Sequence, residues 1–588
     1  MLAEKTIPAL WRAALLEERT TPAYLIETSA GWREVSWQEA ETAVTELANG
    51  LLALGVRKGD AFAIMARTSL EWALFDFALA HVGAVTAPIY PSSSPKDAAY
   101  IAEHSESLGV LTEDAEQLAA LTAQVGNGSL RHRLTFADLD SLRARGRDYA
   151  ASNPAALDEA AAAISPDDLF TYIYTSGTTG PPKACMIRHR NYYDMCATVS
   201  AMQSLLQGGD TVLLYLPLAH NFGRLTHLLG PHLDYTIAFC PDPLRVGEVL
   251  PHVRPTVLPS VPRVFEKVHS AVIAKFDEAT GVKRRLVDWA LRVGRRMSVL
   301  RQRDEPIPRG LALQHRIADK LVYSKVKARL GGRLRAAVSG GAPLAKEIAE
   351  YFHALDILIL EGYGQTECTT ACAANRIDRF RFGTVGQAMP GFELRIAEDG
   401  EILIKGPTIF AGYYKDEQAT REVLDEDGWL HSGDVGQLDE DGFLTITDRK
   451  KDIIVTAGGK NVAPQNLENE LKSSRFVSQA LVIGDKRPFI VALVTLDEAE
   501  VKQWAGQRGF DGDLAALSKH EQVRELVSGI VEGVNSDRSG FEQIKRFAIL
   551  PRDFAADHEE VTPTLKLRRR ICEQHFAAEV DQLYSGVG

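Results

Sequence analysis

One stretch of nine residues, 175–183, constrains the fold of this chain more than any other. It reads Thr-Ser-Gly-Thr-Thr-Gly-Pro-Pro-Lys and follows an apolar, aromatic run at 169–174, which is typical of a buried strand. Its two glycines allow the backbone to turn tightly and to approach a ligand closely. Hydroxyl and backbone N–H groups can donate to the oxygens of a polyphosphate, and the ammonium of Lys183 offsets its charge. The sequence therefore predicts a strand that ends in a phosphate-binding loop.

The alternative interpretation of a loop rich in Ser, Thr and Gly is a polar turn after a strand. The loop is not a Walker A sequence, because no Gly-x-x-x-x-Gly-Lys-Ser/Thr occurs in it. The order of all nine residues nevertheless argues against a chance occurrence. The expected phosphate ligands are Thr175, Ser176, Gly177, Thr178, Thr179, Gly180 and Lys183.

Two further strands are predicted to end in turns that can bind a nucleotide. The run 334–338 leads into Ser-Gly-Gly-Ala-Pro, and the run 357–360 leads into Glu-Gly-Tyr-Gly-Gln-Thr-Glu at 361–367. Ligands of open α/β sheets bind beyond the carboxyl ends of the strands, so both turns are expected at one site. The tyrosine ring can stack on adenine, and Glu367 can hold Mg²⁺, which prefers oxygen ligands and phosphates. The expected nucleotide ligands here are Gly340, Gly341, Glu361, Gly362, Tyr363, Gly364, Gln365 and Thr366.

Helical and strand patterns alternate along residues 36–112, as in a layered α/β domain. Residues 144–166 are rich in Ala, Asp and Pro and are interpreted as a connector. The predicted helices of the first region span 37–54 and 70–81, and its predicted strands span 61–66 and 85–90.

The composition is that of a large globular protein that does not bind nucleic acids. At 588 residues the chain is too long for a single core, so two or more domains are expected. The net charge of −12 argues against general binding of nucleic acids. Residues 1–20 lack an apolar signal core, and no uncharged apolar run has the length of a membrane span. We therefore expect a cytoplasmic protein whose contact with the inner face of the membrane is peripheral at most.

Further segments carry candidate functional residues. A strand predicted to end at Pro217 leaves His220 on the following turn, although a lone histidine is more often structural than catalytic. Residues 428–434 end in Asp434, whose carboxylate can accept hydrogen bonds from both hydroxyls of a ribose. Residues 447–455 read Thr-Asp-Arg-Lys-Lys-Asp-Ile-Ile-Val, and residues 562–566 read Thr-Pro-Thr-Leu-Lys.

These motifs follow one another in the order found in adenylate-forming ligases, and the chain resembles this superfamily of AMP-dependent synthetases and ligases over roughly residues 10–570. It is most similar to the bacterial long-chain-fatty-acid–CoA ligases. The resemblance implies an α/β fold: a large N-terminal layered adenylation domain (βαβ subdomains and a distorted barrel) and a small, mobile α+β C-terminal domain. The implied boundaries are 1–450 for the adenylation and acyl-binding domain and 451–588 for the mobile domain. In two departures, Ala184 replaces a usual Gly, and Arg224 stands where some bacterial members have a Trp gate.

The resemblance also implies roles for single residues. Asp434 and Arg449 hold the ribose, Lys451 is the hinge between the domains, and Lys566 is the catalytic lysine of the mobile domain. Gly458, Gly459 and Lys460 form a loop that serves the step with coenzyme A, and His220 lines the acyl pocket. The candidate catalytic residues are Lys566, Glu367, Arg449 and His220, and the candidate metal ligands are Thr175 and Glu367.

The implied reaction has two steps. A fatty-acid carboxylate attacks the α-phosphate of ATP with release of pyrophosphate, and the thiol of coenzyme A then attacks the acyl-adenylate. The expected metal cofactor is Mg²⁺, the expected co-substrates are ATP and coenzyme A, and the expected acid is a long-chain fatty acid. A medium-chain or aryl acid–CoA ligase, or a decayed nucleotide-binding protein without catalysis, are the alternatives. The presence of Glu367, Asp434, Arg449 and Lys566 argues against decay.

A basic helical insertion is predicted at about 263–330. Residues 281–335 contain 16 Lys and Arg against 4 Asp and Glu, so they carry +12 while the remainder carries −24. This surface is either a solvated charged face or a contact with anionic lipid. The apolar residues considered for the lipid contact are Leu286, Trp289, Leu291 and Leu300.

Overall fold

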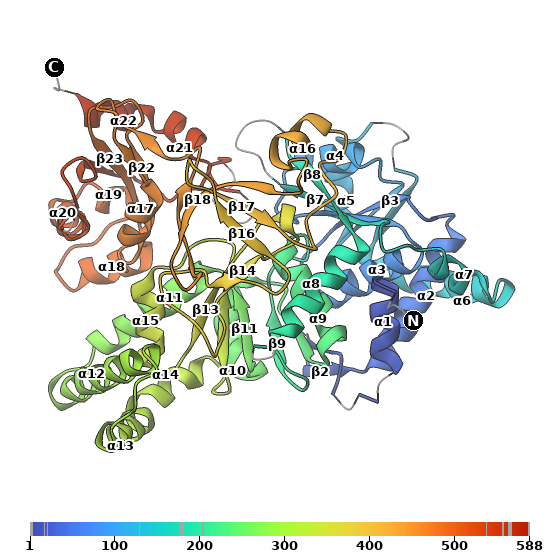
Figure 1. Cartoon of the computed structure of the whole chain (residues 1–588), viewed down its shortest axis with the longest axis horizontal. Coiled ribbons are helices and arrows are strands. Elements are labelled where there is room, and N and C mark those ends of the chain that lie inside the picture. The colour runs from blue at the N-terminus through green and yellow to red at the C-terminus, as the bar shows by residue number, and fades with distance from the viewer. Residues whose placement is uncertain are drawn as a thin grey trace.

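Five sheets organise the computed structural model of this chain. It describes residues 4–16, 18–19, 21–126, 128, 130–175, 181–202, 205–536, 538–555, 558–562 and 567–585. Within this part of the chain, two large sheets and an antiparallel four-stranded sheet belong to the N-terminal region, and two small sheets belong to the C-terminal region (Figure 1).

The first sheet has six strands in the order β6-β5-β3-β4-β7-β8. The strands β3, β4 and β5 are parallel neighbours and are buried throughout, as expected for parallel strands covered on both faces. β7 runs parallel to β4 and pairs with β8 as an antiparallel hairpin, so the residues between 175 and 183 connect two paired strands. The strands are β3 (Ala61–Met65), β4 (Val85–Ile89), β5 (Gly109–Thr112), β6 (His132–Thr135), β7 (Leu169–Thr175) and β8 (Lys183–Arg188).

The second sheet has nine strands in the order β15-β14-β13-β12-β11-β9-β10-β1-β2. The strands from β13 to β1 run parallel, and the strands at both edges are antiparallel. Ser339 of β12 pairs with Glu361 of β13, so the two predicted strand-end segments lie side by side. The strands are β1 (Tyr24–Thr28), β2 (Gly31–Val35), β9 (Thr211–Leu214), β10 (Thr236–Phe239), β11 (Val257–Ser260), β12 (Ala336–Ser339), β13 (Ile359–Tyr363), β14 (Ala373–Ala374) and β15 (Gln387–Ala388).

Helices pack on these two sheets, and their ends follow capping rules. The helix α2 begins after Ser36, whose hydroxyl accepts a hydrogen bond from the Glu39 amide at 3.1 Å. The predicted helices at 37–54 and 70–81 are confirmed as α2 and α3. The helices are α1 (Ile7–Leu16), α2 (Trp37–Ala53), α3 (Leu70–His81), α4 (Pro95–His104), α5 (Ala115–Thr122), α6 (Leu139–Ser152), α7 (Ala156–Ala162), α8 (His189–Ala201), α9 (Asn221–Leu233), α10 (Val246–Val253) and α15 (Lys346–Ala354), with short turns η1 (Phe136–Asp138) and η2 (Pro243–Arg245).

The prediction of a connector at 144–166 is wrong, because α6 and α7 occupy most of it. Alanine is the best helix former, and here the alanines outweigh the scattered Asp and Pro. α6 crosses α2 so closely that a Cβ atom on Gly146 would lie 1.9 Å from the Glu46 carbonyl oxygen. This close crossing of two helices gives α6 a packing partner that the local sequence does not reveal.

The third sheet is antiparallel, in the order β16-β17-β18-β19. It places Asp434 of β18 directly opposite Arg449 of β19. The elements are β16 (Glu393–Ile396), β17 (Glu401–Lys405), α16 (Glu417–Val423), β18 (Leu430–Leu438) and β19 (Leu444–Arg449).

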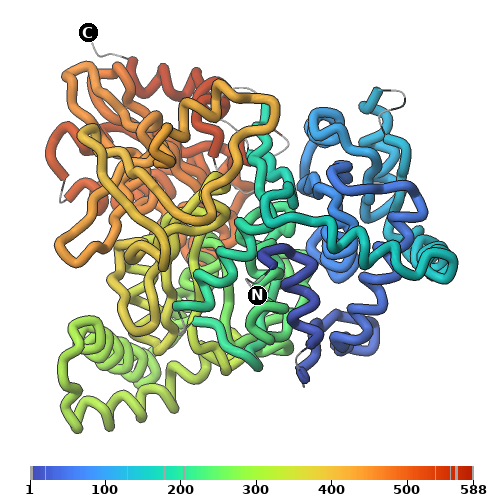
Figure 2. The backbone as a smooth tube through the Cα atoms, turned by 45° about the vertical axis from the view of Figure 1, so that its right-hand side comes forward, coloured from blue at the N-terminus to red at the C-terminus, as the bar shows by residue number. Residues whose placement is uncertain are grey.

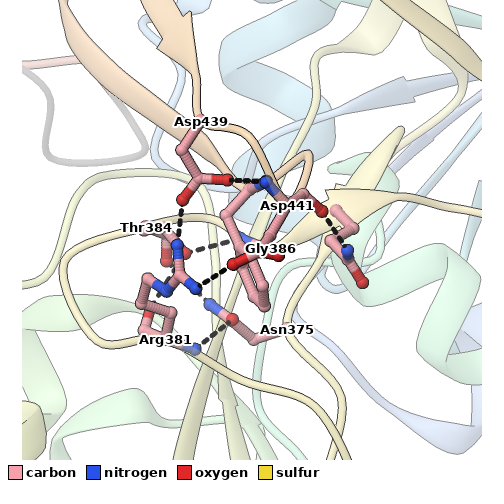
Figure 3. A network of polar contacts seen from close by, with 8 residues as sticks. Asn375, Arg381, Thr384, Gly386, Asp439 and Asp441 are labelled. Atoms are coloured by element: carbon pink, nitrogen blue, oxygen red, sulfur yellow. Dashed lines mark hydrogen bonds and ion pairs between the residues drawn. The ribbon is translucent and has the colours of Figure 1, made fainter.

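A polar network fastens this third sheet to the segment between β14 and β15 (Figure 3). Arg381 of that segment forms ion pairs with Asp439 and with Asp441, the latter at 2.7 Å, both in the turn between β18 and β19. The Asn375 side chain accepts a hydrogen bond from the Arg381 amide at 2.9 Å. The hairpin that carries Asp434 and Arg449 is thereby held against the continuation of β13.

The chain beyond β19 has hydrophobic clusters of its own, which contain no residue before Ile454. β22 pairs antiparallel with β23, and β24 pairs parallel with β23. The elements are β20 (Ile454–Val455), β21 (Asn461–Val462), α17 (Pro464–Lys472), β22 (Val477–Ile483), β23 (Ile490–Leu496), α18 (Glu498–Gly506), α19 (Leu514–Leu517), α20 (Glu521–Asn535), β24 (Ile544–Ile549), α21 (Arg569–His575) and α22 (Ala577–Tyr584).

The basic insertion is helical, as predicted, and its first helix contacts the C-terminal region. Arg263 of this helix donates to the Ser478 carbonyl at 3.0 Å and to the Ser478 hydroxyl at 2.9 Å. Arg475 lies 3.5 Å from Asp277. The helices of the insertion are α11 (Pro262–Asp277), α12 (Gly281–Gln302), α13 (Arg309–Ala318), the π-helical turn η3 (Asp319–Tyr323) and α14 (Ser324–Arg329).

The predicted fold class is confirmed: the protein is mixed α/β, with a large N-terminal domain and a separate C-terminal domain. Two predicted strand ends are wrong. β9 ends at Leu214 rather than Pro217, and β13 continues to Tyr363 rather than ending at Leu360, because its last two residues pair antiparallel with β14.

Candidate functional site

The two arms of the predicted phosphate loop pair across the hairpin of β7 and β8. Thr175 and Lys183 stand opposite each other, and the Thr175 hydroxyl donates to the Lys183 carbonyl at 3.4 Å. The predicted ligands between them, Ser176, Gly177, Thr178, Thr179 and Gly180, lie outside the described residues. The first and last predicted phosphate ligands are thus neighbours at the end of β7.

The ammonium of Lys183 lies beside two residues that the sequence analysis missed. It is 3.8 Å from a carboxylate oxygen of Asp416 and 5.1 Å from the centroid of the Tyr413 ring. A backbone bridge between Cys185 of β8 and Tyr413 brings this distant segment to the loop. The Lys183 side chain is 40% exposed, so its charge is accessible to an anion in solution.

Glu367 lies in a short 3-10 turn, η4 (Thr366–Cys368), directly after β13. Its Oε1 accepts a hydrogen bond from the Tyr413 hydroxyl at 2.6 Å. The buried thiol of Cys185 interacts with both Glu367 and Thr175, and burial together with the Glu367 charge raises the pKa of that thiol well above its usual value. The two candidate metal ligands, Thr175 and Glu367, therefore flank one buried thiol.

This donor set suits a magnesium ion that is held largely by phosphate. It offers the carboxylate of Glu367 and the hydroxyl of Thr175, and the described residues contain no group of three or more His, Cys, Asp or Glu side chains that could hold a metal. Mg²⁺ is commonly bound by one or two carboxylates together with water and substrate phosphates. These residues fit Mg²⁺ bound with a nucleotide.

Asp434 is held from two sides by residues on neighbouring strands. The Tyr363 hydroxyl donates to Asp434 Oδ2 at 2.7 Å, and Arg449 Nε lies 3.2 Å from Oδ1. Tyr363 and Asp434 are both buried. Burial and the Asp434 charge raise the pKa of Tyr363 well above its usual value, so the phenol remains a donor. The predicted ribose ligands Asp434 and Arg449 thus lie together next to Tyr363.

At this edge of the sheet, Glu361 is buried and two positions favour glycine. The buried Glu361 carboxylate accepts a hydrogen bond from the Leu344 amide at 3.1 Å, and burial raises the pKa of Glu361 to about 7. Gly341 has a φ of +83°, which favours glycine. A Cβ atom on Gly364 would lie 2.3 Å from the Thr370 carbonyl oxygen, so only glycine fits there.

The remaining predicted nucleotide ligands lie on the same two segments. Gly340 follows β12, and Gly362 lies within β13. The Thr366 carbonyl accepts a hydrogen bond from the Asn221 side chain at 3.5 Å. The side-chain nitrogen of Gln365 is buried and has no hydrogen-bond partner among the described residues. Buried donors without a partner are rare, so this nitrogen is a candidate donor to a ligand.

His220 caps the N-terminus of α9, beside the turn that carries Glu367. Its Nδ1 accepts a hydrogen bond from the Phe222 amide at 3.2 Å, and the neighbouring Asn221 carbonyl accepts one from the Thr370 hydroxyl at 3.4 Å. A neutral His220 therefore carries its proton on Nε2. His220 thus lies next to the segment that carries Glu367, and its place at the acyl pocket stays a prediction.

Arg224, at the position of the Trp gate in some relatives, has no exposed surface. It pairs with the buried Asp76, donates to the Thr171 hydroxyl at 2.6 Å, and lies 4.4 Å from the centroid of the Phe170 ring. These contacts join α3, β7 and α9 within the core. Arg224 is thus a packing residue behind the phosphate-loop strand.

Lys451, the predicted hinge, follows β19 and adjoins the site. Its pKa is lowered, because burial and the nearby Arg449 charge disfavour the protonated amine. The carboxylates of Asp434 and Glu367 act in the opposite direction. The Lys451 amine therefore lies within the electrostatic field of the residues predicted to bind Mg·ATP.

The predicted coenzyme A loop is a tight hairpin between β20 and β21. Gly458, Gly459 and Lys460 lie in this turn, in which Gly459 has a φ of +71°. The ammonium of Lys460 lies 5.8 Å from the centroid of the Phe541 ring. The hairpin thus carries two glycines and the cation of Lys460 on the C-terminal domain.

The predicted catalytic lysine, Lys566, lies outside the described residues. The described residues on either side, Val561 and Leu567, form an antiparallel backbone bridge. Shortly after Leu567, Arg569 pairs with the buried Glu468 of α17 at 2.5 Å. This ion pair joins α21 to α17 within the C-terminal domain.

Comparisons with known proteins cover nearly the whole chain. Residues 11–414 match the family model described as AMP-binding enzyme, and residues 451–588 match the AMP-binding enzyme C-terminal domain. The long-chain-fatty-acid–CoA ligase FadD15 of Mycobacterium bovis is 39% identical over 583 residues, which are 97% of this chain and 96% of that protein. Human long-chain-fatty-acid–CoA ligase 1 is 31% identical over 556 residues, 89% of this chain and 78% of that protein.

Solved structures share the fold. The adenylation domain of a carboxylate reductase from Mycobacterium chelonae has a TM-score of 0.76 at 23% identity and covers 99% of this chain and 91% of its own. ATP-bound MatB from Rhodopseudomonas palustris has a TM-score of 0.68 at 22% identity and covers 97% of this chain and 99% of its own. At these identities the likeness establishes the fold alone.

Proposed function

Because the chain belongs to the AMP-binding enzyme family, we propose that it is an AMP-forming long-chain-fatty-acid–CoA ligase. It converts a fatty acid, ATP and coenzyme A into acyl-CoA, AMP and pyrophosphate. The observation that carries this conclusion is the 39% identity to a long-chain-fatty-acid–CoA ligase along almost the full length of both chains. A medium-chain or aryl acid ligase and a decayed nucleotide-binding protein are not favoured.

In the first step, an oxygen of the fatty-acid carboxylate attacks the α-phosphorus of ATP, and the bond to the leaving pyrophosphate breaks. Lys183 and the loop before it hold the phosphates in this proposal, and Thr175 and Glu367 hold Mg²⁺. The metal ion, when bound, neutralises phosphate charge. Lys566 donates to the oxygens on which charge develops, since an anion must approach another anion.

The nucleoside half of ATP binds between β13 and β19 in the proposed arrangement. Asp434 and Arg449 contact the ribose, and the hydrogen bond from Tyr363 fixes the Asp434 carboxylate before the ligand arrives. Such preorganisation lowers the cost of aligning the α-phosphate for in-line attack. The unpaired amide nitrogen of Gln365 supports a nucleotide at this edge of the sheet.

In the second step, the sulfur of coenzyme A attacks the acyl carbonyl carbon, AMP leaves, and the thiol proton passes to solvent. We assign residues 1–450 to the adenylation and acyl-binding domain and 451–588 to the mobile domain. Rotation about Lys451 withdraws Lys566 and brings Gly458, Gly459 and Lys460 to the thioester step. The separate hydrophobic clusters beyond Ile454 support a domain that moves as a unit.

The substrates of the ligase are small molecules. Among the described residues, no helix is both long enough and apolar enough to cross a membrane. Our proposal places the enzyme in the cytoplasm, in peripheral contact with the inner face of the membrane through the basic insertion. The local charge of +12 on residues 281–335 supports this contact.

The test is coenzyme A-dependent formation of AMP with a panel of acids from acetate to oleate and one aryl acid. Activity that rises with chain length and requires coenzyme A is the expected result. AMP formation only with short or aryl acids would assign the chain to another branch of the family. Absence of AMP formation with every acid would indicate a decayed site.

A further inference from the structure

Three large apolar side chains lie exposed in a row on the basic insertion. Leu313 is 60% exposed, Ile317 45% and Leu321 41%. They lie four residues apart on the helical segment that runs from α13 through the π-helical turn η3, so they share one face. We call this set the 313–321 stripe.

The opposite side of the same helical segment is buried. Leu311, Ala318, Val322 and Tyr323 belong to the main hydrophobic core. One apolar face of this helical segment therefore packs against the core, and the 313–321 stripe is a second apolar face that is exposed to solvent. Contiguous apolar exposure of this kind on a polar-rimmed surface marks an interaction site more often than scattered single residues do.

Basic side chains flank the stripe and lack acidic partners. Arg309, Arg316, Lys320, Lys325 and Arg329 are all exposed, and none of them forms an ion pair with a described residue. The acidic residue of the segment 309–329 is Asp319, which is paired with Lys327 at 2.5 Å. The surface around the stripe is therefore strongly positive, although the chain as a whole carries −12.

The neighbouring helix α12 extends the positive surface, and it also exposes two single apolar side chains, Val282 (81% exposed) and Val299 (45% exposed). Arg285, Arg292, Arg295 and Arg296 are exposed and likewise form no ion pair with a described residue. Its apolar residues Leu286, Trp289, Leu291 and Leu300 pack against the main core. These four residues are thus partly covered by the core, and the 313–321 stripe on α13 and η3 is the more continuous exposed apolar face.

The position of α12 and α13 suits contact with an extended surface. Both helices lie at the periphery of the molecule, at the lower left of Figure 1, on the opposite side from the six-stranded sheet. The same light-green helices stand at the lower left edge in Figure 2. A broad, flat partner can therefore approach this end of the molecule.

From these observations we infer that the 313–321 stripe docks the enzyme on a bilayer that contains anionic lipid. The apolar side chains enter the boundary between headgroups and acyl chains, and the five flanking cations bind lipid phosphates. An amphipathic helix with a basic rim binds such a surface because its apolar side chains are buried and its cations are attracted to anionic lipid. The inference deepens the proposed peripheral contact, and it places the enzyme where a long-chain fatty acid partitions.

The first experiment is co-sedimentation of the full chain with vesicles of phosphatidylcholine alone or mixed with phosphatidylglycerol, at low and high salt. The wild type is expected to bind the mixed vesicles at low salt. Two triple variants, L313S/I317S/L321S and R309Q/R316Q/K320Q, are each expected to lose at least about tenfold in affinity for the mixed vesicles. L16S/L244S, which changes two exposed leucines elsewhere, and K96Q/R131Q/K519Q, which removes three cations elsewhere, are the matched controls and should bind like the wild type.

The second experiment reports the immersion of the stripe directly. All six native cysteines are buried, so a single cysteine introduced by I317C can be labelled with an environment-sensitive fluorophore. Its emission should shift to the blue on addition of mixed vesicles, whereas the same label on L244C should not respond. Absence of vesicle binding by the wild type at low salt, equal binding by the stripe variant, or no shift at I317C would overturn the inference, and an acidic protein would then be the partner to test.

Ligase activity with detergent-solubilised oleate separates this inference from the proposed function. The stripe variants are expected to retain activity within about twofold of the wild type, because α13 is not part of the proposed site. If the wild type binds vesicles but forms no acyl-CoA, the function fails and the docking surface stands. If the wild type forms acyl-CoA but does not bind vesicles, the function stands and the docking surface fails.

Discussion

The hydroxyl of Tyr413 donates a hydrogen bond to the carboxylate of Glu367 at 2.6 Å. The ring of the same tyrosine lies 5.1 Å below the ammonium of Lys183. One side chain therefore joins the candidate metal ligand to the last residue of the predicted phosphate loop. We regard Tyr413 as a positioning residue for the first step.

Replacement of Tyr413 by Phe keeps the ring and removes this hydrogen bond. Loss of one such bond to a charged group weakens the hold on Glu367 by about 1.5–3 kcal/mol. We expect Y413F to need roughly tenfold more Mg²⁺ for half-maximal pyrophosphate release, because Glu367 is then held less firmly. Calorimetric binding of ATP with and without Mg²⁺ gives a readout independent of turnover.

E367A is the matched reference for this prediction, because it removes the carboxylate itself. It should lower adenylation by about 10²–10³, as loss of a preorganised charge partner does. Identical Mg²⁺ dependence of wild type, Y413F and E367A would remove both residues from the metal site.

Burial of Glu361 predicts a pH-dependent stability. Its pKa is raised from an ordinary value of 4.5 to about 7. Between these values the unfolded carboxyl loses its proton while the folded one keeps it, so the free energy of unfolding falls as pH rises. At about 1.4 kcal/mol for each pKa unit, the loss approaches about 3 kcal/mol above pH 7.

E361Q cannot ionise and should not show this loss. Urea unfolding at pH 5 and pH 8 is the measurement, and the variant should gain stability relative to the wild type at the higher pH. An equal difference between the two proteins at both values would mean that the Glu361 carboxyl is not buried in its neutral form.

The strands and turns of the candidate site could be predicted because their signals are local. Apolar runs followed by Gly, Ser and Thr predicted β7, β12 and β13, of which β12 and β13 are paired neighbours. Asp434 and Arg449 stand opposite each other on two other strands, β18 and β19. Tyr413 and Asp416 could not be found in this way. Their role depends on the bridge from Tyr413 to Cys185, two residues far apart in the sequence.

Long-range packing also explains the other failures. The alanine-rich segment at 144–166 is helical because α6 packs on α2, where Gly146 permits close approach to Glu46. The apolar residues of α12 and α13 have similar helical spacing, and only the fold decides that Leu286 faces the core while Leu313 faces solvent. The amphipathic pattern of a helix alone does not predict whether its apolar face packs against the core or is exposed to solvent.

The buried ion pair between Arg224 and Asp76 makes a prediction about stability. R224M should cost about 3–5 kcal/mol in urea unfolding, because it leaves the Asp76 carboxylate buried without its partner. The double variant D76N/R224M should recover much of this loss, since no buried charge remains. If the double variant were no more stable than R224M, the ion pair would not be the cause. Chain-length preference should not change, because Arg224 has no exposed surface.

The proposed mechanism requires that the C-terminal domain carries a lysine used in one step only. Lys566 follows the proposed hinge at Lys451 in the sequence. K451P, which fixes φ at the hinge, should form acyl-adenylate but transfer it slowly to coenzyme A. This variant serves as the reverse control for Lys566.

The most direct measurement is of both half-reactions with K566A. Acyl-adenylate formation from oleate and ATP should fall by about 10²–10³, the typical loss when one preorganised donor is removed. The conversion of chemically supplied oleoyl-adenylate and coenzyme A to oleoyl-CoA should continue at a rate close to that of the wild type. An equal loss in both half-reactions would contradict the account, because Lys566 would then be structural and the two steps would not use different arrangements of the C-terminal domain.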